Sequence, residues 1–303
     1  MVSLAAWSVL LLAGLSAVAA SGSPAVIEQF PSTVQIEIGY RHAWVQYCVG
    51  NLITGRHVLT VAHCTSGPVF DPRILRVRAG ATYRGRDGVV NGVDSVKNHP
   101  NFNIRKGFTY DASIIRVDGY FYASPAINTV SIAAPGVYFP DNVPVTVAAW
   151  GRTTQDQLWA DRELRSNILY TVNRHTCQER YTLNEFPIDL PDSIPIPQLP
   201  ELPDLPIEIP DLPITIPDLP ESIPIVIPDD FFPISLPITE TMLCTRLPNE
   251  DGQNLGIRDG GSPLFYQNIL VGMVSFGLPV GNSRPLVATD VSHLSNWIVQ
   301  NVD

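Results

Sequence analysis

The stretch that decides the fold is Thr60-Val61-Ala62-His63-Cys64, in which a histidine follows apolar residues and precedes a cysteine. A second stretch, Tyr110-Asp111-Ala112-Ser113-Ile114, sets an aspartate just before a run of residues typical of strands. Taken singly, a histidine or an aspartate of a secreted protein is most often structural. The two stretches gain meaning only together with other segments in the same order along the chain.

Both stretches resemble the chymotrypsin and trypsin family of serine proteases. Ala62-His63-Cys64 is similar to the family's histidine segment, and Asp111 takes the position of the aspartate in its Asp-Ile-Ala-Leu segment. Four shorter segments fit the family in the same order: Ile27–Pro31, His99-Pro100, Trp150-Gly151 and Val172–Arg174. The resemblance runs from about Ile27 to the end, apart from a proline-rich tract. It implies an all-β fold of two packed six-stranded antiparallel β-barrels with a C-terminal helix.

The hydrophobic pattern outside the tract agrees with an all-β fold. Short runs rich in Val, Ile, Thr and Tyr alternate with Gly, Pro and Asn, as strands separated by turns do. The clearest runs are Ser32–Ile38, Val58–Val61, Ile114–Val117, Val143–Trp150 and Ile269–Phe276. One later segment, Val291–Val299, has the apolar period of a helix, and we expect this helix to close the chain.

The nucleophile of this family is the serine of a Gly-Asp-Ser-Gly-Gly-Pro motif. The matching stretch here is Arg258-Asp259-Gly260-Gly261-Ser262-Pro263, so Gly260 stands in the nucleophile's position. Glycine has no group that can attack a carbonyl, and losing the nucleophile of such a unit costs about six orders of magnitude in turnover. We therefore expect a non-catalytic homologue with a vestigial His63–Asp111 pair. Ser262 is the alternative nucleophile for a weak hydrolase, but it lies two residues further on.

Further departures concern the oxyanion hole and the specificity pocket that the resemblance implies. Arg258 replaces a glycine whose N–H contributes to the oxyanion hole. The base of the pocket aligns with Asn254, and a wall that is usually glycine aligns with Leu286, whose side chain is expected to fill the cavity. Ser275 and Gly277 are retained, so a strand able to pair with an extended peptide is expected to survive.

The four cysteines suit an oxidising compartment, where disulfides persist. The resemblance implies the pairs Cys48–Cys64 and Cys177–Cys244. In the family the second pair spans a short loop, whereas here it encloses the proline-rich tract. Both ends of the tract are thus expected beside the region that borders the substrate cleft in active members.

The acidic, proline-rich tract spans residues 186–238. It holds 15 of the 28 prolines, ten acidic residues and no Lys or Arg, and Pro-Asp-Leu-Pro recurs at Pro203, Pro210 and Pro217. Proline fixes φ and lacks an N–H, which excludes helices and inner strands and favours polyproline II or extended chain. Three roles stay open: a loosely packed insertion, a surface for binding or self-association, and an expansion without function.

The first twenty residues carry the marks of a secretory signal peptide, with an apolar run at Val9–Leu15 before the small residues Ala17–Ala20. The run is too short to span a bilayer, which disfavours a membrane anchor. We expect cleavage near Ala20 and a secreted domain over residues 21–303, interrupted by the tract.

In active members of the family a new N-terminal amine pairs with the aspartate that matches Asp259. Counting back from Ile27 puts this amine near Ala19, so we expect that the mature N-terminus could reach Asp259.

Charge and histidine spacing exclude other classes of function. The formal net charge is −10, all of it accounted for by the tract, which argues against a nucleic-acid partner. The six histidines are scattered and lack ligand spacing, so we expect neither a metal nor a cofactor.

Three functions remain. The first, implied by resemblance to non-catalytic, insect-like family members, is a binding, scaffold or regulatory protein whose partners are extracellular components of protease cascades or matrix. The second is a weak endopeptidase that uses Ser262. The third is a structural protein that self-assembles through the tract.

Overall fold

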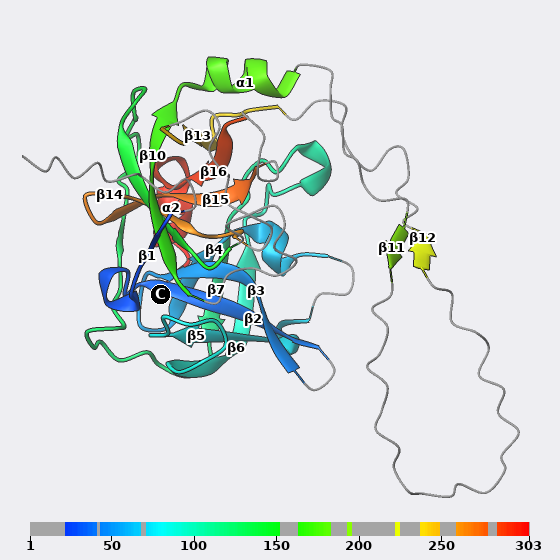
Figure 1. The fold of residues 1–303 in the computed structure, drawn as a ribbon, viewed down its shortest axis with the longest axis vertical. Helices are drawn as coiled ribbons and strands as arrows, with labels where there is room; N and C mark the ends of the chain where they lie inside the picture. Colours follow the sequence, from blue (N-terminus) through cyan, green and yellow to red (C-terminus); the bar gives the residue numbers. More distant parts are fainter. Residues whose placement is uncertain are drawn as a thin grey trace, which may run out of the picture.

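Two antiparallel β-barrels make up the body of the protein (Figure 1). The computed structural model describes residues 22–40, 43–67, 71–151, 163–182, 193–195, 222–224, 237–248, 259–277 and 284–302. The expected signal peptide, residues 1–20, and most of the proline-rich tract lie outside the described residues.

The first barrel is a closed ring in the order β2-β3-β4-β7-β6-β5. Its strands are β2 (Thr33–Tyr40), β3 (Ala43–Leu52), β4 (His57–Thr60), β5 (Leu75–Ala79), β6 (Val89–Asn98) and β7 (Ser113–Val117). Alternate residues of a strand point to opposite faces, so each strand delivers apolar side chains to the interior. Val34, Ile36, Val77 and Ile115 are fully buried there.

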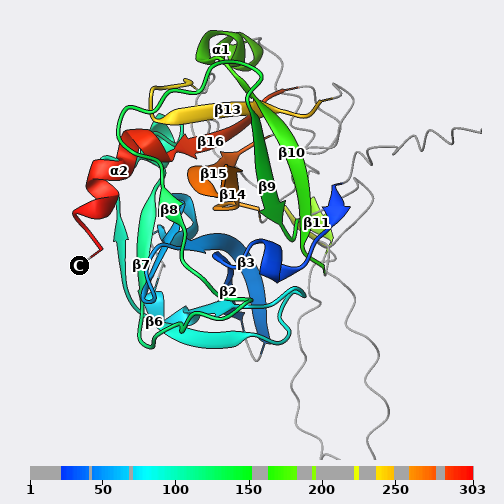
Figure 2. The same cartoon turned by 90° about the vertical axis from the view of Figure 1, so that its left-hand side faces the viewer.

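The second barrel closes because β9 and β10 pair with each other as well as with their other neighbours. Its strands are β9 (Pro144–Ala149), β10 (Arg165–Val172), β13 (Met242–Arg246), β14 (Pro263–Tyr266), β15 (Ile269–Phe276) and β16 (Leu286–Asp290). Two short strands extend it, since β1 (Ser23–Pro24) pairs with β10 and β8 (Ser131–Ile132) pairs with β15. The double six-stranded barrel expected from the sequence is thus confirmed (Figure 2).

Helix α2 (Val291–Val299) has the bounds that its apolar period predicted. The Asp290 side chain caps it by accepting hydrogen bonds from the backbone N–H groups of Ser292 and His293. Val291, Leu294 and Ile298 of α2 join the core of the first barrel.

Helix α1 (Arg174–Thr182) was not predicted, because its sequence is mostly polar. Cys177 and Tyr181, which lie four residues apart on the inner face of this helix, are both buried. The residue that could have indicated this helix in the sequence is Asn173, whose side chain accepts a hydrogen bond from the Thr176 N–H at 2.9 Å, as an N-cap does.

Four 3₁₀ turns are also described: η1 (Ile27–Gln29), η2 (Ala62–Thr65), η3 (Pro72–Ile74) and η4 (Ile104–Lys106). None of the helices in the described ranges is both long and apolar enough to cross a membrane.

Two pieces of the proline-rich tract are described, and they form short antiparallel strands. β11 (Ser193–Pro195) pairs with β12 (Ser222–Pro224), with Ile194 opposite Ile223. At the end of the tract the Ile238 N–H donates to Gln178 Oε1 of α1 at 2.6 Å. The C-terminal end of the tract is therefore fixed on the second barrel.

Both expected disulfides are present. Cys48–Cys64 joins β3 to η2, and Cys177–Cys244 joins α1 to β13. The second bond closes a separation of 67 residues and the first only 16.

His99 is buried directly after β6, and its N–H donates to the carbonyl of Ala112, the residue after Asp111. Its ring stacks on Tyr110 at 4.7 Å and lies 4.9 Å from the ring of Trp297 in α2. The Asn101 N–H donates to His99 Nδ1, an arrangement that requires an unprotonated Nδ1. Burial, with a smaller contribution from nearby His293, lowers the pKa of His99.

Removal of each disulfide should lower the free energy of unfolding, and by a different amount for each. The loop-entropy relation gives about 4 kcal/mol for Cys177–Cys244 and about 3 kcal/mol for Cys48–Cys64. We expect the double variant Cys177→Ala/Cys244→Ala to lose more stability than Cys48→Ala/Cys64→Ala in urea unfolding. An equal or reversed order would show that the long separation does not govern the stabilisation.

The buried His99 should make stability depend on pH. Since its native pKa lies below the ordinary value of 6.5, the unfolded chain binds the proton first as the pH falls. The free energy of unfolding should therefore decrease as the pH falls through about 6.5, and His99→Gln should flatten this slope. His175→Gln, at an exposed position, is the matched control and should leave the slope unchanged.

Candidate functional site

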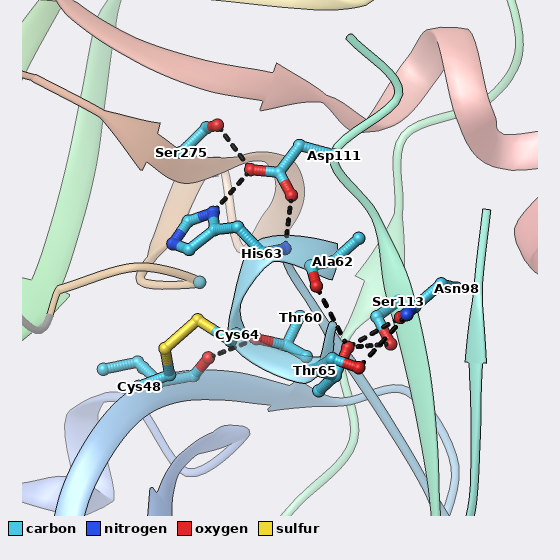
Figure 3. The surroundings of a disulfide bond; sticks show 12 residues. Cys48, Thr60, Ala62, His63, Cys64, Thr65, Asn98, Asp111, Ser113 and Ser275 are labelled. Atoms are coloured by element: carbon cyan, nitrogen blue, oxygen red, sulfur yellow. Dashed lines mark hydrogen bonds and ion pairs between the residues drawn. A yellow bond between two sulfur atoms is a disulfide. The ribbon is translucent and has the colours of Figure 1, made fainter. Parts of the chain in front are cut away.

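His63 lies in η2, the 3₁₀ turn that follows β4 (Figure 3). Side chains beneath it hold the turn in place. The Thr65 hydroxyl donates to Asn98 Oδ1 at 2.6 Å and lies 2.8 Å from the Ser113 hydroxyl. Asn98 Nδ2 in turn donates to the Thr65 carbonyl at 3.1 Å. These contacts to β6 and β7 fix the direction in which the imidazole points.

Asp111 is 1% exposed and orients His63 through both carboxylate oxygens. Oδ1 accepts the backbone N–H of His63 at 2.9 Å, and Oδ2 lies 2.7 Å from His63 Nδ1. Ser275 Oγ donates to Oδ2 at 2.6 Å, and Thr289 Oγ1 donates to the Asp111 carbonyl at 2.7 Å (Figure 3 shows Ser275). Since an ionised carboxylate only accepts, Nδ1 carries the proton and Nε2 is left as the basic nitrogen.

Gly260 faces that basic nitrogen. A Cβ built on Gly260 would lie 2.8 Å from His63 Nε2 and 3.2 Å from Cys64 Sγ. The backbone on either side is tightly held, because the Val49 N–H donates to the Gly260 carbonyl at 2.8 Å and the Gly261 N–H donates to the Val274 carbonyl at 2.8 Å. The structure thus brings His63, Asp111, Ser275 and Gly260 together, with no side chain where a nucleophile would stand.

Ser262 does not fill this gap. The residue is fully buried, and its Oγ has no hydrogen-bond partner among the described residues. Its N–H donates to the Asp259 carbonyl at 2.9 Å, and its carbonyl accepts the Val274 N–H at 2.8 Å. A buried hydroxyl held in this way cannot approach a substrate's carbonyl unless the segment rearranges.

Leu286 occupies the space beside Gly277. A Cβ on Gly277 would lie 2.7 Å from Leu286 Cδ1, and Leu286 is only 2% exposed. The leucine side chain packs with Val147, Leu243 and other apolar residues of the second barrel. Asn254 and Arg258, the other residues predicted for this region, lie outside the described residues.

An aromatic cover over the imidazole was missed by the sequence reasoning. The ring of Phe108 stands perpendicular to the His63 ring at 5.7 Å and lies 5.3 Å from the ring of Phe276. Phe276 in turn contacts Tyr181 of α1 at 5.7 Å. Phe108 has a φ of +63°, and Gly107 before it also has a positive φ. A glycine at this place is the feature of the sequence that could have indicated the turn that carries Phe108.

Asp259 is buried, and its carboxylate lies against Gly151, where a Cβ would come within 1.7 Å of Oδ2. Ala19, the position proposed for a docking amine, lies outside the described residues. The described N-terminal residues run along β10, where the Ala25 N–H donates to the Leu164 carbonyl at 2.9 Å. Docking of the amine on Asp259 therefore stays a prediction.

Cys48, His63 and Cys64 place potential ligand atoms within 4.8 Å of one another. Both sulfur atoms are bonded to each other, so His63 is the one member that could still bind a metal.

Comparison with known proteins identifies the family. The family model for trypsin matches residues 19–190 and 224–298. "Trypsin, alkaline A" of Manduca sexta is 27% identical, over 96% of this chain and 97% of its own length. "Achelase-1" of Lonomia achelous is 32% identical, over 84% of this chain and 94% of its own.

Among solved structures, that of the scabies mite inactivated protease paralogue S-D1 matches with a TM-score of 0.68. It is 16% identical and covers 92% of this chain and 95% of its own. At this identity the likeness concerns the fold alone, whereas the family model spans most of the sequence. The chain therefore belongs to the trypsin family.

Proposed function

We propose that this protein is a catalytically inactive trypsin-family member that acts by binding other proteins outside the cell. The observation that carries the proposal is the glycine opposite the general base. Gly260 presents no atom beyond its backbone to His63 Nε2, although the base and its orienting carboxylate are arranged as in a working triad.

Two further observations support the loss of peptidase activity. Leu286 fills space beside Gly277 that a substrate side chain would need. Ser262, the alternative nucleophile, is fully buried. A return to activity would thus require changes at several places, which disfavours the weak-hydrolase alternative.

The retained histidine–aspartate pair has a structural use that does not depend on catalysis. The buried Asp111 carboxylate accepts hydrogen bonds from His63 and Ser275, and removal of these donors would leave a buried charge without compensation. Retention of the pair is therefore compatible with an inactive protein.

For the binding role we propose the acidic tract, residues 186–238, as the recognition element. The Cys177–Cys244 disulfide and the Ile238–Gln178 hydrogen bond anchor it on the second barrel. Its ten acidic residues and absence of Lys and Arg favour a partner with a basic surface. Self-assembly through the same tract is the alternative, and it would appear as concentration-dependent sedimentation that is lost when residues 186–238 are deleted.

The inactivity is tested by covalent labelling with a fluorophosphonate, read by intact mass. We expect no adduct on the native protein, because neither Gly260 nor the buried Ser262 offers an activated hydroxyl. A stoichiometric adduct that maps to Ser262 would overturn the proposal.

Gly260→Ser is the matched gain-of-function variant. Gly260 does not have a positive φ, so serine can adopt its backbone conformation once the His63 ring shifts slightly. We expect this variant to acquire a fluorophosphonate adduct at residue 260 while peptide hydrolysis stays far below that of active trypsins, because Leu286 still fills the pocket. Gly260→Ala is the control and should remain unlabelled.

Secretion predicts a defined mature N-terminus. We expect the protein expressed in insect cells to be recovered from the medium with cleavage near Ala20, as read by N-terminal sequencing. Recovery of the protein from the cell pellet with Met1 retained would contradict the prediction of a signal peptide.

A further inference from the structure

A cavity of about 610 Å³ lies at the junction of the two barrels, and none of its lining residues belongs to the His63–Asp111 site. Four segments form it: residues 29–32 at the end of η1, residues 128–130, Thr146 of β9, and Phe265 of β14 together with Gln267 and Asn268 in the β14–β15 turn. In Figure 1, η1 (dark blue) and β14 (orange) both lie on the left-hand side. The volume falls within the range of about 300–1,000 Å³ that is usual for small-ligand sites. We call this cavity the amide groove.

The lining of the amide groove combines side-chain amides and hydroxyls with an aromatic base. Gln29, Asn128, Gln267 and Asn268 supply the amides, while Ser32, Thr129 and Thr146 supply the hydroxyls. The rings of Phe30 and Phe265 stack at 6.0 Å with an angle of 14° between their planes. The lining contains no Asp, Glu, Lys, Arg or His.

Part of the hydrogen-bonding capacity of these amides is already used within the chain. Gln29 Oε1 accepts the Val26 N–H at 3.2 Å, and Asn128 Oδ1 accepts the Thr129 N–H at 2.8 Å. Each of these amides thus keeps its NH₂ group as a donor for a ligand. The oxygen of Gln267 supplies an acceptor on the opposite segment, since its Nε2 is the group that contacts the Tyr266 hydroxyl.

The β14–β15 turn that carries two of these amides is held in an uncommon conformation. Gln267 and Asn268 have φ values of +49° and +64°, and both are non-glycine residues in the left-handed region. This geometry matches the twist of a tight hairpin and fixes the backbone from which the two exposed side chains extend.

The chemistry of the groove excludes several classes of ligand. The lining offers no charged side chain to pair with a phosphate, sulfate or carboxylate or with a cationic ligand, which disfavours these classes. A peptide cannot add as a strand here, because Thr146 of β9 already pairs with Phe265 on one side and Ile168 on the other. An amphipathic helix would require an apolar strip, whereas seven of the lining side chains are polar.

We propose that the amide groove binds a neutral oligosaccharide. Sugar hydroxyls both donate and accept hydrogen bonds, which suits amide donors, an amide oxygen and three hydroxyls that converge on one cavity. The apolar C–H face of a sugar ring would pack against Phe30, which is half-buried, whereas Phe265 is buried beneath the groove and stacks on Phe30. Neither His63 nor Gly260 lines this groove. The proposal of sugar binding can therefore be tested independently of the proposed loss of catalysis.

The test is a glycan array of neutral and sulfated oligosaccharides probed with the full-length protein, followed by titration calorimetry on the strongest neutral hit. We expect a neutral oligosaccharide to bind, and Asn128→Ala and Gln267→Ala each to weaken it about fivefold, as the loss of one hydrogen bond implies. Asn101→Ala, an exposed amide outside the groove, is the matched control and should bind as the native chain does.

Three outcomes would overturn the proposal. These are an array on which neutral oligosaccharides fail to bind the folded protein, binding restricted to sulfated sugars, and binding to a neutral sugar that both groove variants retain in full. Because each variant lies on the exposed surface, circular dichroism can verify that it folds before binding is measured. Fluorophosphonate labelling is unaffected by any of these outcomes, so the two proposals fail independently.

Discussion

The structure depends on one buried carboxylate at the junction of the barrels. Asp111 precedes β7 of the first barrel, yet its partners come from both halves: the N–H and Nδ1 of His63, and the hydroxyls of Ser275 and Thr289 in the second barrel. A carboxylate buried to this degree must be compensated by donors, and relative movement of the barrels would remove the one donor that the second barrel supplies to it, Ser275 Oγ. The His63–Asp111 pair therefore has a reason to persist in the absence of catalysis.

A glycine at position 260 is compatible with the fold because the neighbouring interactions use the backbone. The Gly260 carbonyl accepts the Val49 N–H, and the Gly261 carbonyl accepts Asn51 Nδ2 at 3.0 Å. These bonds join the two barrels across the site and need no side chain at residue 260. By contrast, Gly261 cannot be replaced, since its φ is +87° and a Cβ would lie 1.9 Å from the Val49 carbonyl oxygen.

The proline-rich tract and the amide groove are the two places to which we assign binding. The proline-rich tract is enclosed by the Cys177–Cys244 disulfide, close to the aromatic contact between Tyr181 and Phe276. The amide groove lies between other segments and has a different chemistry. Neither proposed surface includes the His63–Asp111 pair, although the amide groove is lined in part by the core residue Phe265.

The sequence by itself determined the family, because ordered motifs and strand periodicity are local properties of the chain. Through that resemblance it implied the two disulfides, the histidine–aspartate pair and the glycine in the nucleophile's position. It also gave the bounds of α2, whose apolar residues recur along one face. Helix α1 escaped prediction because only Cys177 and Tyr181 bury its inner face. The cover of Phe108 over His63, the burial of Ser262 and the convergence of Gln29, Asn128 and Gln267 on one groove were decided by tertiary structure alone. Each depends on segments far apart in the chain, and their approach is fixed by closure and packing of the barrels rather than by local sequence.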